Sequence, residues 1–593
     1  MENSGSIKGG EFIVKDVSAN DIFIPEEFDE EQQMIAQTCD DFLESEVFPN
    51  LDKIDYQEEG IMRNLLEKAG ELGLLGISIP EEYDGFGQSF VTSQLVADKL
   101  GAGYSFAVAF SCHTGIGSMP ILYYGNEDQK QKYLPKLASG EWIGAYCLTE
   151  PGAGSDANAG KTKAVLSNDG KHYILNGQKM WITNSGFADI FTVFAKIDND
   201  RVLSAFIVEK DFPGIVLNPE EKKMGIKGSS TRQVFFNDCE VPVDNLLGAR
   251  GKGFRIALNI LHMGRIKLGG NVLGAAKLTI THAVNYANER KQFGSLISSF
   301  GSIKHKLAEQ VVKTFTNESV VYRASGNVDE AVEQNLSECT KETAMITAYA
   351  QFAVEAAILK VFGSEALDYV VDEALQIYGG MGYSAEMPVE RGYRDSRINR
   401  IFEGTNEINR ILVVDTLLKR GAKKEFDLFG EAKKTVDDLN NLIKTKNDAT
   451  DYYKRKEFFI KNYKKVALIL IHISTEKFQR KLVYEQEVLN RLSDILMNVY
   501  VAESTLLRLQ KLESMKGTDY IGVYKDITDI CIYDAASLIR KASLDVLYAI
   551  EGLENINEYI SAVEHLTKTD GVNTKDARRR IADRLIEDNT YKF

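Results

Sequence analysis

The spacing of apolar residues predicts long helices over much of this 593-residue chain. Between residues 346 and 361, apolar side chains recur every three or four positions, which is typical of a helix that buries one face. Residues 28–140 have a similar helical pattern. None of the ten prolines lies between Pro242 and Pro388, and none follows Pro388. Because proline is excluded from helix interiors, both of these stretches are predicted to be helical.

The segment from about residue 146 to 245 has a different pattern, rich in glycine and in strand-like runs. These runs include HYILNGQKMWIT, IFTVFAKI and LSAFIVEK. Asn176-Gly177, inside the first run, is a hairpin signal, because a type I′ turn needs two residues with positive φ. A charged, glycine-poor stretch begins at about 425, after Arg420-Gly421, which we expect to cap a helix C-terminus. The predicted order is therefore helical, β, helical and a second helical region.

Composition and charge narrow the class of protein. A hydrophobic content of 44% is ordinary for a globular chain, and a net charge of −16 argues against nucleic-acid binding. The six cysteines are scattered without a CxxC pair and the seven histidines lack metal-ligand spacing, so we expect neither a disulfide framework nor a metal site. No apolar run approaches the ~20 residues of a membrane span. The N-terminus, MENSGSIKGGEF, has no signal-peptide core, so we expect a cytoplasmic protein of bacterial type.

The first segment with candidate chemistry is a glycine-rich loop, Tyr146-Cys-Leu-Thr-Glu-Pro-Gly-Ala-Gly-Ser-Asp156. Its small residues leave backbone N–H groups open to a ligand, and Gly152 and Gly154 permit close approach. The loop lacks the GxGxxG spacing and the βαβ context of a Rossmann site. Many loops of this kind bind nothing, so a simple turn remains the alternative.

Two further segments place an aromatic or a basic residue at a position that suits a cofactor. Trp181, in the sequence WITN, packs either in a core or against a flat cofactor ring to which Thr183 hydrogen-bonds. Arg290, in the sequence RKQFG at the end of a predicted helix, either interacts with the helix dipole or neutralises a pyrophosphate. Neither segment decides between its alternatives alone.

The fourth segment is the longest and contains two glycine-bearing parts, QIYGGMGY from residue 376 and IFEGTNEI from residue 401. Glu403 lies between Phe402 and Gly404, in an apolar setting. Desolvation disfavours the ionised form of such a carboxylate, so its pKa should rise toward that of a working base. The alternative is a glutamate exposed at a helix cap.

Together the four segments resemble the acyl-CoA dehydrogenase family from about residue 28 to 420. CLTEPGAGSD, WITN, RKQFG, QIYGGMGY and IFEGTNEI occur in the family's order and approximate spacing. The chain most closely resembles the very-long-chain branch, through KKMGIKGSSTRQVFF, NILHMGR, SSFGSIK and the helical region past 425. Gly301 stands where many relatives outside that branch have glutamine.

The resemblance implies a fold that is mainly α with a central β-barrel domain, and FAD bound between the barrel and a helical bundle. This order agrees with the one that proline, glycine and periodicity indicate. The expected divisions are an N-terminal arm (1–27), an N-terminal helical domain (28–145), a middle β-barrel domain (146–250), a helical bundle with the catalytic base (251–422) and an additional C-terminal helical domain (423–593).

Carried over motif by motif, the resemblance assigns Glu403 as the catalytic base. The residues expected to line the flavin are Tyr146, Leu148, Thr149, Trp181, Ile182 and Thr183. The residues expected to contact the substrate are Arg265, Gly404 and Ser155, the last of which also contacts FAD. The residues expected to hold the adenine dinucleotide half are Arg290 and Phe293. Those expected to reach the FAD of a neighbouring subunit are Gln376, Gly379 and Gly380, and those expected to close over the cofactor are Thr405 and Glu407.

The implied activity is FAD-dependent α,β-dehydrogenation of a long-chain fatty acyl-CoA to a trans-2-enoyl-CoA in fatty acid β-oxidation. Glu403 would remove the α-proton while its backbone N–H and a ribityl hydroxyl of FAD stabilise the developing enolate. The β-hydrogen would leave as hydride to the flavin, which an electron-transfer flavoprotein would reoxidise. The resemblance also implies a homodimer. The alternatives are an acyl-CoA oxidase and a flavin-binding scaffold protein without catalysis.

Two details concern the substrate and the membrane. Ser111, Cys112, Thr114 and Gly115 are small where a bulky residue would shorten the acyl pocket, although small residues also allow close helix packing. Residues 453–470 alternate basic with aromatic or apolar side chains, which is typical of a helix on an anionic membrane. Such a helix would make peripheral contact with the inner membrane. The alternative is the solvated face of a packed helix.

Overall fold

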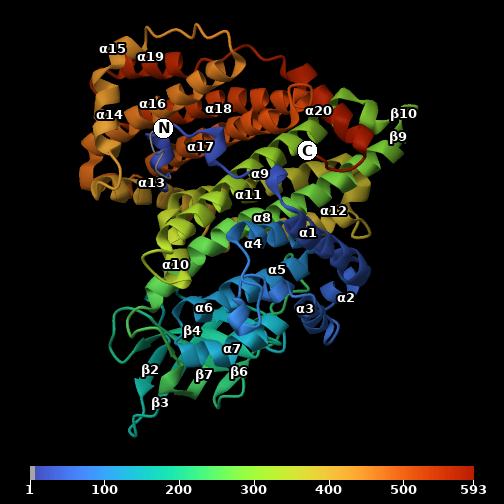
Figure 1. Cartoon of the computed structure of the whole chain (residues 1–593), viewed down its shortest axis with the longest axis vertical. Helices are drawn as coiled ribbons and strands as arrows, with labels where there is room; N and C mark the ends of the chain where they lie inside the picture. Colours follow the sequence, from blue (N-terminus) through green and yellow to red (C-terminus); the bar gives the residue numbers. More distant parts are fainter. Residues whose placement is uncertain (1–6) are drawn as a thin grey trace.

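The computed structural model of the chain describes residues 7–593. Helices make up most of it, and the strands of the large sheet, within residues 144–247, gather at one end of the molecule (Figure 1). The first residues of the N-terminus, from which we expected no signal peptide, lie outside the described part. A mainly helical fold with a further C-terminal helical region agrees with the predicted class.

A series of helices follows the N-terminal arm, and reciprocal caps fix where some of them begin. The Asp29 side chain accepts from the backbone N–H of Gln32, and the Gln32 side chain accepts from the backbone N–H of Asp29. Asn126 and Gln129 form the same reciprocal pair at the start of α7. These caps satisfy N–H groups that the helix itself leaves free. The helices are α1 (Glu30–Phe42), α2 (Leu51–Asp55), α3 (Ile61–Glu71), α4 (Phe90–Leu100), α5 (Ser105–Ser111), α6 (Met119–Tyr124) and α7 (Glu127–Ser139).

The continuous stretch from α5 to α6 corrects one expectation. Ser105–Tyr124 is long and apolar enough to cross a membrane by length and composition, and 83% of it is buried inside the protein. A core helix passes the same test, and the burial favours that explanation. Lys341–Gln351 and Ala353–Tyr383 pass only if this pair, bent by 63°, is counted as one span.

The strands form a curved sheet in the order β6-β7-β3-β2-β4-β5-β8, with β1 beside β4. β1 and β2 pair in parallel with different ends of β4, and both halves of the sheet contribute to one core that includes Phe191, Phe206 and Phe236. Within residues 7–593 the end strands β6 and β8 do not pair, so the closed barrel that we expected is not present. The strands are β1 (Gly144–Cys147), β2 (Lys163–Leu166), β3 (His172–Thr183), β4 (Ile190–Ile197), β5 (Ser204–Glu209), β6 (Ile215–Leu217), β7 (Thr231–Pro242) and β8 (Leu246–Leu247).

The hairpin predicted at Asn176-Gly177 is wrong. Both residues lie inside β3, where the pairing with β7 shifts by a bulge. A Cβ at Gly177 would come within 2.5 Å of Thr162 Oγ1, so glycine here allows two backbones to approach closely. The turn between β2 and β3 instead has Gly170 at φ 71°, with Asp169 accepting from a neighbouring hydroxyl and backbone N–H.

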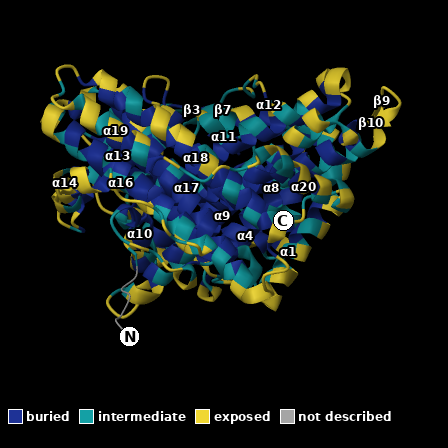
Figure 2. Cartoon of the chain, turned by 90° about the horizontal axis from the view of Figure 1, so that it is seen from above, coloured by how far each residue is buried: buried dark blue, intermediate teal, exposed yellow. Residues whose placement is uncertain are grey.

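The proline-free stretch forms the longest helices, as predicted. α8 (Gly253–Glu289), α9 (Gly301–Asn335) and α11 (Ala353–Tyr378) pack against one another through the buried centre of the molecule (Figure 2). The remaining elements of this region are the hairpin β9 (Lys291–Gln292) and β10 (Ser295–Leu296), and the helices α10 (Lys341–Gln351), α12 (Pro388–Ser396) and α13 (Asn406–Ala422).

The C-terminal helical region shares its core with this bundle. One buried apolar cluster runs from Phe12 through the bundle to Leu566. The expected C-cap at Arg420-Gly421 is wrong, because α13 continues to Ala422. A Cβ at Gly421 would come 2.8 Å from Leu428, so the glycine allows the next helix to approach. The helices are α14 (Leu428–Asp437), α15 (Leu439–Leu442), α16 (Tyr452–Phe478), α17 (Gln486–Lys516), α18 (Gly522–Ala549), α19 (Ile556–Leu566) and α20 (Thr574–Asp588).

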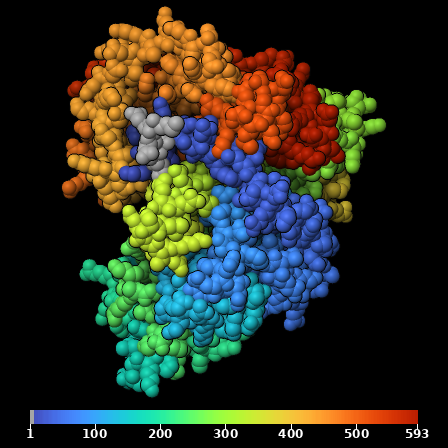
Figure 3. All heavy atoms as spheres, in the orientation of Figure 1, coloured from blue at the N-terminus to red at the C-terminus, as the bar shows by residue number. Residues whose placement is uncertain are grey.

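The N-terminal arm lies against the C-terminal helices, where Figure 3 shows the start of the chain beside its last third. Arg508 on α17 is buried and pairs with Glu26 of the arm at 2.7 Å and with Glu318 of α9 at 2.8 Å. Lys464 on α16 donates to the carbonyl of Lys15 at 2.9 Å. A buried arginine needs such partners, so the arm, the bundle and the C-terminal region depend on one another.

The basic segment 453–470 lies within α16, and its apolar side faces the protein interior. Phe459 and Tyr463 are buried. Lys456 pairs with Asp529 at 2.7 Å, and Lys464 is also buried and ion-paired. This arrangement favours a packed helix over one that inserts into a membrane.

Candidate active site

Glu403 lies in a short loop between α12 and α13, in a backbone conformation that side chains rarely adopt. Its φ is 59°, and that of Gly404 is 86°. Arg265 Nε on α8 donates to the Glu403 carbonyl at 3.0 Å, and Asn409 Nδ2 donates to the Gly404 carbonyl at 2.7 Å. These bonds hold the loop in its strained form, which is typical of a functional site.

The Glu403 carboxylate points to α8 and has an unsatisfied oxygen. Oε2 is buried without a hydrogen-bond partner among the described residues, and a Cβ at Gly264 would lie 3.2 Å from it. Burial raises the pKa of Glu403, while the positive charges of Arg265 and Lys360 lower it. The exposed-glutamate alternative is therefore wrong, and the geometry is that of a desolvated base.

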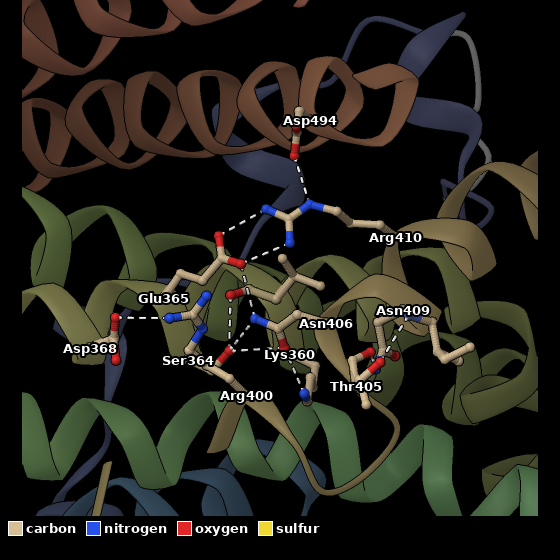
Figure 4. A network of polar contacts seen from close by, with 12 residues as sticks. Lys360, Ser364, Glu365, Asp368, Arg400, Thr405, Asn406, Asn409, Arg410 and Asp494 are labelled. Carbon is tan, nitrogen blue, oxygen red and sulfur yellow. Dashed lines mark hydrogen bonds and ion pairs between the residues drawn. The ribbon is translucent and has the colours of Figure 1, made fainter. Parts of the chain in front are cut away.

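A polar network supports the loop from α11 (Figure 4). Asn406, the first residue of α13, accepts from Lys360 Nζ at 2.6 Å and donates to Ser364 at 3.1 Å and to Glu365 at 3.0 Å. Burial lowers the pKa of Lys360 to about 7, and the Glu403 charge raises it. Lys360 therefore links the network electrostatically to Glu403.

The same network continues into the C-terminal region. Arg410 on α13 binds both oxygens of Glu365 at 2.8 and 2.9 Å, and its Nε pairs with Asp494 of α17 at 2.8 Å (Figure 4). A bidentate arginine–carboxylate contact fixes the relative orientation of the two side chains as well as their distance. The C-terminal region thus contacts α13, the helix that begins directly after the Glu403 loop.

A mostly apolar cavity starts at Glu403 and follows α8. Ser111, Cys112 and Gly115, three of the four small residues predicted to shape it, line the cavity, whereas Thr114 does not. Asp395 lines it too, and burial raises the pKa of Asp395 to about 7. The lining residues of α8 are Gly264, Lys267, Leu268, Asn271, Val272, Ala275, Leu278 and Thr279.

The sheet brings some of the predicted flavin residues to the mouth of this cavity. Thr183, at the end of β3, lines the cavity beside Glu403. Tyr146 on β1 is buried, and its hydroxyl has no partner within residues 7–593. Burial raises the pKa of Tyr146, and the negative charge of Glu403 raises it further. Leu148, two residues after Tyr146, and Ile182, directly before Thr183, are also buried. Thr149, intermediate in exposure, accepts at its carbonyl from the backbone of Met180.

Trp181 and the glycine-rich loop from Pro151 to Asp156 are largely exposed to solvent. The Trp181 side chain is 52% exposed at φ 60°, so the core-packing alternative is wrong. A Cβ at Gly152 or Gly154 would meet no atom within 4 Å, and Ser155 is exposed. Thr405 caps α13 by accepting from the backbone N–H of Ile408.

A second group of predicted residues lies away from Glu403 in a single chain. Arg290 follows α8, and Phe293 at the tip of the β9–β10 hairpin is 97% exposed. Gln376, Gly379 and Gly380, at the end of α11, are also exposed. Stacking of Tyr286 on Tyr378, with centroids 4.0 Å apart, joins these two helix ends. Figure 1 places the hairpin well away from β3.

Glu407, in the first turn of α13, is exposed. Its own backbone N–H and the Thr405 hydroxyl lower its pKa. An ionised carboxylate at a helix N-terminus is favourable, so this position needs no ligand to explain it.

Sequence patterns missed two groups that the structure places near the base. Lys360 interrupts the apolar run Ile358-Leu359-Lys360-Val361, and Lys267 stands between Ile266 and Leu268. A charge inside an apolar helical run was the available signal. Asn406 lies inside the recognised motif IFEGTNEI and Asn409 directly follows it, but only the fold shows that both residues support the Glu403 loop.

The residues at the mouth of the cavity fit a flat, extended cofactor such as FAD. Buried polar atoms are normally hydrogen-bonded, so the unpartnered Tyr146 hydroxyl indicates a group that the described residues do not supply. The exposed Trp181 ring and the open backbone at Gly152 and Gly154 offer a stacking surface and N–H donors beside it.

Family models match most of the chain. The acyl-CoA dehydrogenase N-terminal domain matches residues 29–141, the middle domain 145–239 and the C-terminal domain 251–418. A further acyl-CoA dehydrogenase C-terminal domain matches residues 462–564.

Individual relatives agree with these matches. A probable acyl-CoA dehydrogenase of Bacillus subtilis (strain 168) is 44% identical over 98% of both chains. The human mitochondrial very long-chain specific acyl-CoA dehydrogenase is 37% identical over 79% of this chain and 73% of its own length. A crystal structure of acyl-CoA dehydrogenase complexed with FAD from Bacillus anthracis, 43% identical, covers 99% of this chain and 100% of that chain with a TM-score of 0.96. The chain therefore belongs to the acyl-CoA dehydrogenase family and is an FAD-dependent oxidoreductase with an additional C-terminal helical domain.

Proposed function

We propose that this enzyme converts long-chain fatty acyl-CoA to trans-2-enoyl-CoA in β-oxidation, with Glu403 as the base. The observation that carries the proposal is the buried Glu403 oxygen without a partner among residues 7–593, at the start of a mostly apolar cavity. Burial of an ionised carboxylate in this setting costs free energy unless a bound substrate interacts with its free oxygen. The acyl α-carbon is the atom that the cavity would deliver to it.

The residues around Glu403 divide the chemical work. Glu403 takes the α-proton, and its raised pKa makes it a stronger base than an exposed glutamate. Its backbone N–H makes no hydrogen bond with residues 7–593 and is the candidate donor to the thioester oxygen, where enolate charge develops. Arg265 holds this peptide in place through the carbonyl. When bound, FAD supplies the acceptor for the hydride that leaves the β-carbon.

The cofactor would contact two groups of residues. Six residues suit the flavin: Thr183 lines the cavity, Trp181 and Ile182 directly precede Thr183, and Tyr146, whose pKa is raised by burial and by the Glu403 charge, is followed by Leu148 and Thr149. Ser155 lies on the glycine-rich loop, and Thr405 and Glu407 lie at the start of α13. Arg290, Phe293, Gln376, Gly379 and Gly380 form the exposed group at the ends of α8 and α11.

The length of the cavity supports a long acyl chain. α8 lines it from Gly264 to Thr279, which is about 22 Å of helix. An extended chain advances about 1.2 Å per bond, so this length accommodates roughly 18 carbons. The very long-chain specific relatives support the same choice.

The partners follow from the exposed group and from the relatives. A homodimer would cover Phe293 and the Gly379-Gly380 turn. A chain in a structure of the electron transferring flavoprotein of Acidaminococcus fermentans is 38% identical over 66% of this chain, which supports such a flavoprotein as the electron acceptor. Cytoplasmic location completes the proposal. Membrane contact through α16 does not form part of it, because the apolar face of that helix is buried.

A panel of saturated acyl-CoA thioesters, mixed anaerobically with the purified enzyme, tests the function. We expect rapid loss of visible flavin absorbance with long chains and slower loss with short ones. No loss with any chain would contradict the proposal. Aerobic peroxide release that keeps pace with turnover would show an oxidase, and bound flavin that no thioester reduces would show a scaffold protein.

A further inference from the structure

One buried lysine in the substrate cavity has no partner within the described chain. Residues 7–593 bury five lysines, namely Lys179, Lys267, Lys360, Lys456 and Lys464. The acceptors of the four other than Lys267 include, in that order, Glu150, Asn406, Asp529 and Glu503. The Lys267 ammonium makes no hydrogen bond or ion pair with any residue from 7 to 593. Buried ammonium groups are almost always paired, so this exception requires a cause.

Lys267 lies on the face of α8 that lines the cavity. Gly264, on the same face, is the residue that approaches the Glu403 carboxylate. Lys267 follows three positions later, about 4.5 Å further along the axis. Its side chain is only 7% exposed, and it lines the cavity together with Leu268 and Asn271.

None of the neighbouring polar groups of the cavity pairs with Lys267. Asn271 and Ser111 hydrogen-bond to each other, with Asn271 Nδ2 donating at 2.9 Å. Asp395 Oδ1 accepts from the backbone N–H of Ile226, Oδ2 is buried without a partner among residues 7–593, and neither oxygen pairs with Lys267. Among the described residues, no acceptor of the cavity wall therefore lies within hydrogen-bond distance of the ammonium group.

An unsubstituted acyl chain would make this situation worse. It would displace water from the amine and offer only CH₂ groups in return. Burial lowers the pKa of Lys267 to about 8, so much of the lysine is still charged at neutral pH. A carboxylate on the acyl chain would instead form a charge-assisted hydrogen bond in a dry environment.

We propose that Lys267 determines substrate specificity by binding a carboxylate at the far end of a medium-length acyl chain, so that among acyl chains of this length the enzyme prefers the ω-carboxyacyl-CoA to the unsubstituted thioester. This proposal rests on the proposed function, because it requires an acyl chain in the cavity beside Glu403. The offset along α8 and a lysine stem of about 6 Å place the ammonium at most about 10 Å from the level of the base, so the longest acyl chain whose terminal carboxylate meets it there has roughly eight carbons.

Steady-state kinetics with three thioesters of eight carbons test it: octanoyl-CoA, the ω-carboxylate suberyl-CoA and 8-hydroxyoctanoyl-CoA. For the wild type we expect the highest kcat/KM with suberyl-CoA and the lowest with octanoyl-CoA. Lys267→Met, which keeps the length of the stem and removes the charge, should lower kcat/KM for suberyl-CoA at least about 10-fold and raise it for octanoyl-CoA. Lys267→Arg keeps the charge and should retain the preference for suberyl-CoA.

Several results would overturn the proposal. One is a wild-type enzyme that uses octanoyl-CoA or the hydroxy compound better than suberyl-CoA, which decides the matter without any variant. Another is Lys267→Met with an unchanged ratio between suberyl-CoA and octanoyl-CoA. Flavin content and Tm of each variant check the fold. Palmitoyl-CoA separates the two levels: turnover of it without a carboxylate preference overturns only the role of Lys267, whereas no turnover of any thioester overturns the proposed function as well.

Discussion

The two groups of residues assigned to FAD differ in how far a single chain completes them. Around Glu403, α8, α11, α13 and the sheet enclose the carboxylate and bind the loop that carries it. At the ends of α8 and α11, Phe293 is 97% exposed and a Cβ at Gly379 or Gly380 would meet no atom within 4 Å. The group around Glu403 lies in the protein interior, whereas the group at the ends of α8 and α11 lies on the surface.

The proposed function accounts for this difference. Proton removal next to a thioester needs a desolvated base and fixed donors, because water would weaken both. Binding an adenine dinucleotide needs cationic and backbone contacts, which a surface can offer and a second subunit can complete. We therefore expect changes at the enclosed end to affect chemistry, and changes at the open end to affect cofactor retention and assembly.

Glu403→Gln tests the enclosed end and should have the largest effect. Glutamine keeps the shape of the side chain and cannot accept the α-proton, so kcat should fall by about 10²–10⁴-fold or more while FAD remains bound. Anaerobic mixing with a long-chain acyl-CoA measures this as a flavin that binds the ligand and stays oxidised. Asp415→Asn, on the helix that follows the catalytic loop and in an ion pair with exposed Lys419, is the matched control and should behave like wild type. Reduction of the Glu403→Gln flavin at a near wild-type rate would show that another group is the base.

Arg290→Ala tests the open end. Loss of the guanidinium should weaken FAD retention by roughly 10-fold, because charge-assisted bonds to phosphate are strong, and should leave the rate of flavin reduction in FAD-saturated enzyme nearly unchanged. Flavin fluorescence during dialysis, with light scattering for the oligomeric state, measures the effect. Lys291→Ala, the next residue in the same exposed hairpin, is the control. Equal FAD retention in wild type and Arg290→Ala would place the cofactor elsewhere.

Asp494→Asn asks how far the enclosed end extends into the C-terminal region. Without its carboxylate, Arg410 loses one of the two anchors that hold α13 directly after the catalytic loop. We expect kcat to fall by about 3- to 10-fold with little change in KM, since remote contacts in a packed network typically contribute ~0.5–2 kcal/mol.

The control for this experiment is Asp545→Asn. Asp545 pairs with Arg491, which also contacts Asp494, whereas the ion pairs of Arg410 are with Glu365 and Asp494. The control therefore removes a neighbouring carboxylate of the C-terminal region and leaves both anchors of Arg410 intact. If both variants lower kcat equally, the C-terminal region contributes general stability and does not position the base.

The smallest expected effect concerns the stability cost of the buried base. Because burial raises the pKa of Glu403 above its ordinary 4.5, folding disfavours the ionised form. Below pH 4.5 the side chain is protonated in both states and has no such cost, and above the raised pKa the cost is complete. Glu403→Gln should therefore raise Tm by a few degrees at neutral pH, with the difference disappearing as the pH falls below 4.5. Thermal unfolding of both proteins with FAD saturated measures it, and a lower Tm for the variant at neutral pH would contradict this account.

Much of the architecture was predictable because it depends on local constraints. The absence of proline between Pro242 and Pro388 correctly predicted long helices, and the apolar setting of Glu403 correctly predicted a raised pKa. Local signals failed where a neighbour decided the outcome. Gly177 and Gly421 look like turn and cap residues, but in the structure each makes room for a close approach, by Thr162 and by Leu428 respectively.

The sequence by itself determined the order of helical and β regions, the motifs that identify the family and the residue that acts as the candidate base. These depend on backbone preferences and side-chain chemistry that act within a few residues. Only the tertiary structure decided that the sheet of residues 144–247 stays open, that α16 buries its apolar face, and that Lys267 lies in the cavity without a partner from residues 7–593. Burial and pairing depend on residues far apart in the chain. A lysine in an apolar helix therefore has the same local sequence pattern whether or not the facing element supplies an acceptor for it.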